Sequence, residues 1–81
     1  MTLAERLIER GRREGRLEAI REGRLEGRQE DLLNLLTQKF GAVADADKSN
    51  ITGTRDLDRL DQALGLIFKT KTIAEVLRPL D

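Results

Sequence analysis

Apolar residues recur at helical spacing along much of the chain, and no stretch alternates with the period of two that is typical of a strand. Thr2 and Glu5 form a capping box at the start of this pattern. Gly41 suits the residue that follows a helix end, and Lys39 is favourable in the last turn. The pattern predicts one helix over residues 3–40, about 55 Å long at about 1.5 Å per residue.

Beyond that glycine, the pattern predicts shorter helices. A short helix is expected to end near Ile51. Thr54 is expected to cap the next helix, with Asp56 in its first turn, and Thr72 opens the last helix with a second capping box. Pro79 ends that helix or lies just past its last turn. The predicted fold is therefore all-α, with a long N-terminal helix followed by a small helical C-terminal bundle.

The long helix has two unlike halves, which divide the chain into two predicted units. Residues 1–30 hold a tetrapeptide repeat and few large apolar side chains, whereas residues 31–81, which include the end of the long helix, hold enough apolar residues for a small helical domain. A core of this size is marginal alone, because small chains bury a low fraction of their surface. The predicted core residues are Leu32, Leu33, Leu36, Phe40, Leu57, Leu60, Leu64, Ile67, Phe68, Ile73, Val76 and Leu77.

The repeat of residues 11–30 follows a Gly-Arg-x-Glu pattern, with Ala-Ile once replacing Gly-Arg. On a helix the small residues form a stripe, with arginines on one flank and glutamates on the other. An interior glycine costs about 0.5–1 kcal/mol relative to alanine, and like charges four residues apart repel each other. A partner helix explains both features, because glycine lets two backbones approach closely. The predicted helix–helix association residues are Gly11, Gly15, Ala19, Gly23, Gly27, Arg16, Arg24, Glu18, Glu22 and Glu26.

The charged flanks also indicate an orientation. A parallel two-fold pair brings the arginine flank of one helix to the glutamate flank of the other, whereas an antiparallel pair brings like flanks together. The repeat therefore favours a coiled-coil-like homo-oligomer, as a parallel dimer or a higher assembly. A period of four drifts by about 40° per repeat on a helix of 3.6 residues per turn, so either one contact extends over two or three repeats or several partners bind different faces. The alternative is a solvated, charged helix whose repeat expanded by slippage in the DNA.

Composition excludes several classes of chemistry. The chain has no Cys, His, Trp or Tyr, so thiolate and imidazole ligands, the commonest general base and most base-stacking platforms are missing. Asp45, Asp47, Asp56 and Asp58 fit helix starts better than they fit a calcium loop. No serine or threonine has a credible base beside it. We therefore expect no enzymatic activity, no cofactor, no metal site and no small-molecule substrate.

Charge and hydropathy narrow the choice of partner. Fifteen basic and fifteen acidic residues give a formal net charge of zero, which disfavours nucleic-acid and membrane binding. The arginine stripe nevertheless leaves a DNA-associated accessory domain as the alternative function. No apolar run approaches the roughly 20 residues needed to span a bilayer, and no signal-like run opens the chain, so a cytoplasmic protein is expected. The leading expectation is a non-catalytic module for helical self-association or protein interaction.

The order of segments resembles that of one bacterial family. Glu-Gly-Arg repeats lead into a leucine-rich stretch over 31–41 that ends in Phe-Gly, followed by Leu-Asp-Arg-Leu-Asp-Gln-Ala-Leu at 57–64 and Thr-Ile-Ala-Glu-Val-Leu at 72–77. This order is similar to the uncharacterised C-terminal helical domain of Rpn-type proteins, which have a PD-(D/E)XK nuclease fold, are related to putative transposases and are common in cyanobacteria. The resemblance implies an accessory or oligomerisation domain. The nuclease strands and carboxylates are absent, and Leu-Arg-Pro-Leu at 77–80 replaces the family's Trp-Leu-like pair.

Overall fold

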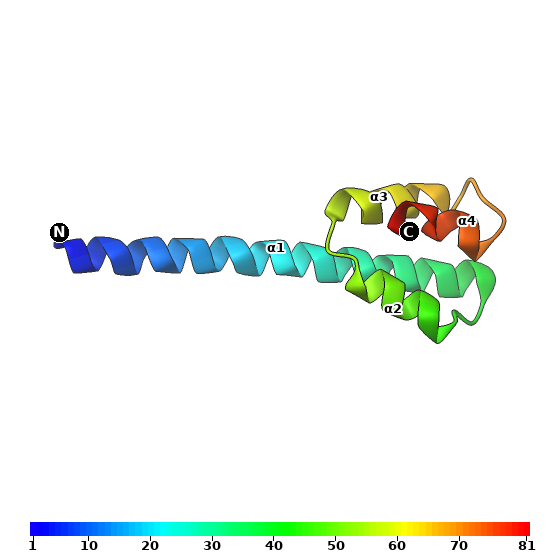
Figure 1. The fold of residues 1–81 in the computed structure, drawn as a ribbon, viewed down its shortest axis with the longest axis horizontal. Coiled ribbons are helices and arrows are strands. Elements are labelled where there is room, and N and C mark those ends of the chain that lie inside the picture. The colour runs from blue at the N-terminus through cyan, green and yellow to red at the C-terminus, as the bar shows by residue number, and fades with distance from the viewer.

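The computed structural model describes all 81 residues and is all-α, as predicted. Helix α1 spans Leu3–Phe40, α2 spans Asp45–Gly53, α3 spans Leu57–Leu66 and α4 spans Ile73–Leu77, and a 3-10 turn, η1, follows over Arg78–Leu80. The molecule measures 59 × 21 × 20 Å, and α1 runs along its whole length (Figure 1). The first half of α1 projects alone, while the other helices gather beside its second half (Figure 1). No helix has the length and apolar content needed to cross a membrane.

Both ends of α1 lie where the sequence predicts them. Thr2 is the N-cap, and its hydroxyl oxygen accepts a hydrogen bond of 3.1 Å from the backbone N–H of Glu5. Gly41 ends the helix with a backbone φ of 84°, a conformation that residues with a Cβ rarely adopt. Its N–H donates to the carbonyl of Thr37, which satisfies one of the last carbonyls of the helix.

The start of α3 differs from the prediction that Thr54 caps it. Asp56 is the cap, because its carboxylate accepts from the N–H groups of Asp58 and Arg59 at 3.0 and 3.3 Å. A carboxylate is favoured at this position by the positive end of the helix dipole. The hydroxyl of Thr54 instead donates to the carbonyl of Asn50 in the last turn of α2, at 2.7 Å.

Two other predicted boundaries are close to the observed ones. Helix α2 continues to Gly53, two residues beyond Ile51. Thr72 caps α4 as predicted, since its hydroxyl oxygen accepts from the N–H of Glu75 at 3.2 Å. Pro79 lies in η1, so the chain tightens into a 3-10 turn directly after α4.

The core lies between the second half of α1 and the shorter helices. Six of the predicted core residues are buried, and five more are partly buried and pack against them. The burial of side chains that are far apart in the sequence holds α1, α3 and η1 together. The buried apolar residues are Leu25, Leu32, Leu36, Val43, Ile51, Leu60, Ala63, Ile67, Val76, Leu77 and Leu80.

Phe68 is the one predicted core residue that the structure places outside the core, with 81% of its surface exposed. The prediction extended the helical spacing of Leu64 one turn further. Helix α3 ends at Leu66, however, and residues 67–69 form a turn, so the helical spacing no longer applies at Phe68. The chain changes direction there, and the aromatic ring lies at the surface.

The core also extends into the repeat. Leu25 is 4% exposed and Gln29 is 9% exposed, and both lie before the unit boundary expected at residue 30. Since α1 is continuous across this point, the boundary falls within one helix. The last part of the repeat therefore packs against the C-terminal helices.

Two polar side chains of α1 bind the ends of the shorter helices. The amide of Gln29 donates to the carbonyls of Thr52 and Thr54, at 3.3 and 2.9 Å, where α2 ends. The ammonium of Lys39 donates to the carbonyls of Ile67 and Thr70, where α3 ends. Carbonyls at helix ends have no partner within their own helix, so each side chain satisfies groups that would otherwise need water.

Candidate association surface

The N-terminal part of α1 has no intramolecular covering. Every residue from Met1 to Arg21 is exposed. We call residues 3–21 of α1 the arm. Most helical stability in proteins comes from tertiary packing, which is minimal along the arm, and Gly11 and Gly15 lower the helix stability of the arm further. Helix propensity alone therefore gives the arm little stability.

The arm also holds most of the exposed large apolar side chains. On the arm these side chains are between 53% and 73% exposed. Outside the arm, the exposed large apolar residues are Met1 and Phe68. Scattered apolar residues are normal on a protein surface, but their concentration on one projecting helix is typical of a contact surface. The five residues on the arm are Leu3, Leu7, Ile8, Leu17 and Ile20.

The predicted glycine stripe is open along its whole length. A Cβ placed on Gly11, Gly15, Gly23 or Gly27 would meet no other atom within 4 Å. Packing within the chain therefore does not require glycine at these positions. Whether a second helix covers the stripe stays a prediction.

Because that space is open, the change Gly15→Ala/Gly23→Ala is expected to raise the helicity of α1. Alanine is favoured over glycine in a helix interior by about 0.5–1 kcal/mol per residue. Circular dichroism at 222 nm during heating measures the effect, and the Gly53→Ala change at the end of α2 serves as a control outside α1. Lower helicity in the double variant would show that the added methyl groups separate two helices that meet at the stripe.

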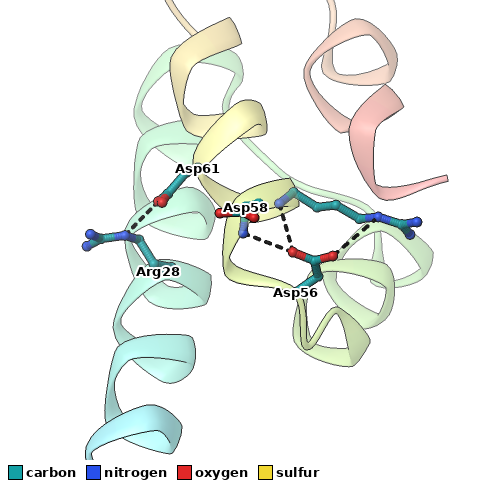
Figure 2. A network of polar contacts seen from close by, with 5 residues as sticks. Arg28, Asp56, Asp58 and Asp61 are labelled. Carbon is teal, nitrogen blue, oxygen red and sulfur yellow. Dashed lines mark hydrogen bonds and ion pairs between the residues drawn. The ribbon is translucent and has the colours of Figure 1, made fainter.

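Only some charged side chains of the repeat form ion pairs within the chain. Near the C-terminal helices, the carboxylate of Glu22 pairs with Arg55, and Nε of Arg28 lies 2.7 Å from the carboxylate of Asp61 (Figure 2). All four side chains are at least two-fifths exposed, so each pair contributes about 0–1 kcal/mol. Glu22, one of the predicted association residues, thus has a partner within the chain.

The other predicted charged association residues form no ion pair. Arg16, Glu18, Arg24 and Glu26 have no opposite charge within 4.0 Å, and no ion pair forms anywhere on the arm. The arm carries six arginines and four glutamates, and none of them forms an ion pair within the chain. They remain available to a second molecule.

The aspartates at the helix starts have the structural roles that the sequence indicates. Asp56, labelled in Figure 2, caps α3, and its carboxylate lies 3.8 Å from Nε of Arg59. Asp45 and Asp47 lie in the first turn of α2, and Asp58 in that of α3. No group of three or more His, Cys, Asp or Glu side chains is arranged to hold a metal ion.

A shallow hollow of about 280 Å³ lies at the base of the arm. It is lined by Leu17, Ile20, Arg21 and Arg24 of α1 and by Leu57 of α3. The sequence did not indicate this hollow, because only the packing of α3 against α1 brings Leu57 beside the repeat. The hollow therefore lies between exposed apolar side chains of the arm and the start of α3.

No family model, curated protein or solved structure matches the chain. The resemblance to the C-terminal domain of Rpn-type proteins stays an expectation that rests on the residues that carry it.

Proposed function

We propose that the chain is a non-catalytic module that associates through the arm, with a second copy of itself as the partner. The observation that carries this proposal is the exposure of every residue from 1 to 21 together with five large apolar side chains on the arm. Contact with another helix would stabilise a segment that is marginal alone. The cytoplasmic setting and the accessory role beside a nuclease- or transposase-like protein, both expected from the sequence, belong to the same proposal.

Sedimentation equilibrium over a wide concentration range tests this proposal. The native chain is expected to form a defined dimer or higher multiple. The Leu7→Glu/Leu17→Glu variant is expected to stay monomeric, because it places charge on two exposed apolar positions of the arm. Phe68→Glu is the matched control, since Phe68 is also exposed and apolar but lies outside the arm. A native chain that is monomeric and folded at every concentration would contradict self-association.

The second candidate is a DNA-associated accessory domain, which is favoured by the excess of unpaired arginines on the arm. Phosphate contacts by arginine would make binding strongly salt-dependent. Fluorescence anisotropy with duplex DNA at low salt tests it, with Arg16→Glu/Arg24→Glu as the variant that should lose binding. Absence of measurable binding by the native chain would remove this candidate.

A further inference from the structure

The face of α1 that enters the core continues along the arm as a regular row. Its members alternate at steps of four and three residues, the spacing of the inner positions in a coiled coil. At about 100° per residue they lie within an arc of about 80° that also contains the core residue Leu25. We call this row the arm seam. It consists of Leu3, Leu7, Arg10, Glu14, Leu17 and Arg21.

We propose that two copies of the chain pair antiparallel through the arm seam, about a two-fold axis near residue 12. This inference rests on the proposed function and specifies its contact. Within the heptad spacing, Leu7, Glu14 and Arg21 occupy one type of inner position, and the other three seam residues occupy the second type. An antiparallel pair places the two types opposite each other.

In this register the four inner layers of the pair are complementary. Leu7 lies opposite the partner's Leu17, and Glu14 lies opposite the partner's Arg10. The two-fold axis repeats each of these layers. Arg10 and Glu14 form no ion pair within the chain, so both are free to make the contact.

A parallel pair would use the same face poorly. It places each inner position opposite its own copy, so Arg10, Glu14 and Arg21 would each face an identical charge. Like charges directly opposite each other are destabilising. Contact through the arm seam therefore favours the antiparallel arrangement, whereas contact through the glycine stripe, with its charged flanks, favours the parallel one. The glycines at 15 and 23 lie more than about 100° around the helix from the centre of the seam, so the two contacts use different faces.

The hollow at the base of the arm supports this register independently. The third layer places the partner's Leu3 opposite Arg21, which lines the hollow together with Leu57 of α3. Leu3 is 73% exposed within one chain. In the pair, the two arms overlap over their whole exposed length, about 27 Å from residue 3 to residue 21. This overlap leaves the second half of α1, beside which the other helices lie, outside the contact (Figure 1).

Charge reversal tests the orientation separately from self-association. In the antiparallel pair, Arg10→Glu places two glutamates opposite each other in both central layers, and Glu14→Arg does the same with arginines. Each single variant is expected to weaken the dimer about tenfold or more, and the double swap Arg10→Glu/Glu14→Arg is expected to restore it. Sedimentation equilibrium measures the dissociation constants. A native dimer that both single variants leave unchanged would overturn the antiparallel contact while keeping the proposed function, and a native monomer would overturn both.

Disulfide trapping gives the second readout, because the chain has no native cysteine. Chains with Leu3→Cys and chains with Arg21→Cys are mixed in a redox buffer. The antiparallel pair is expected to give the mixed 3–21 disulfide, because residues 3 and 3 of two copies lie about 27 Å apart in it. Disulfides between like variants, or a dimer with no mixed disulfide, would overturn the register.

The variant Gly15→Leu/Gly23→Leu distinguishes a contact through the arm seam from a contact through the glycine stripe. Both glycines lie off the arm seam, so the dissociation constant of the dimer is expected to stay within about twofold of the native value. A dimer weakened about tenfold or more would overturn the arm seam as the contact and would favour the glycine stripe.

Discussion

Replacing Leu36 with alanine is expected to leave the C-terminal helices largely unfolded at 37 °C. Leu36 is fully buried in α1 and belongs to a core of eleven residues. Truncation of a buried leucine costs about 2–5 kcal/mol, and a core in a chain of this size rarely supplies more than about 3–5 kcal/mol. The cost is therefore comparable to the whole free energy of unfolding.

Thermal and urea unfolding followed by circular dichroism measure this effect. Phe68→Ala is the control, since it removes more apolar volume from a side chain that is 81% exposed. It is expected to change the free energy of unfolding by less than about 0.5 kcal/mol. Equal unfolding midpoints for the Leu36→Ala variant and the native chain would show that the core does not form as described.

Replacing Gln29 with leucine is expected to lower the free energy of unfolding by about 1–3 kcal/mol, although leucine is apolar and similar in size. The amide of Gln29 is the donor for the carbonyls of Thr52 and Thr54, and it lies almost fully inside the molecule. Leucine leaves both carbonyls without this partner. Gln29→Glu is expected to be worse at neutral pH, because its carboxylate has no hydrogen to donate and its charge would face two carbonyl oxygens.

Urea unfolding distinguishes this hydrogen-bonding role from helix propensity. Gln38→Leu makes the same change at an exposed position of the same helix and is expected to be nearly neutral. If leucine at position 29 stabilised the chain, the apolar gain would exceed the lost hydrogen bonds, and the bridge between α1 and α2 would contribute little.

Local signals in the sequence were enough to predict the ends of α1 and the all-α fold. Thr2 and Gly41 act through their immediate neighbours, so their roles can be predicted without knowledge of the fold. The capping of α3 was harder, because Thr54 and Asp56 both suit a helix start. The choice depended on where α2 ends, and the Thr54 hydroxyl is used there.

Burial depended on contacts between distant segments, and here the predictions were less complete. Leu25 lies within a repeat that is otherwise exposed, and it becomes buried only because the other helices fold back onto α1. Phe68 was wrongly assigned to the core because its spacing assumed one more helical turn. The prediction of one helix over residues 3–40 is confirmed, and much of its first half is exposed.

The hollow and the polar bridges of α1 had no local signal. Leu57 was predicted as a core residue, yet it also lines the hollow at the base of the arm. Lys39 lies in the last turn of its own helix, as predicted, and its ammonium also binds carbonyls at the end of α3, which was not predicted. Such pairings become visible only when the relative placement of the helices is known.

Because α1 runs without a break from the arm into the core, the number of repeat units sets both the length of the arm and its rotation relative to the core. Each tetrapeptide adds about 6 Å of helix and turns everything before it by about 40° about the helix axis. Gain or loss of one repeat unit would therefore change both the reach and the angular phase of whatever is bound at the far end. Nine added units would restore the original phase, because 36 residues make about ten full turns. Variation in repeat number would thus act as a stepwise rotation, with the packed helices as its fixed base.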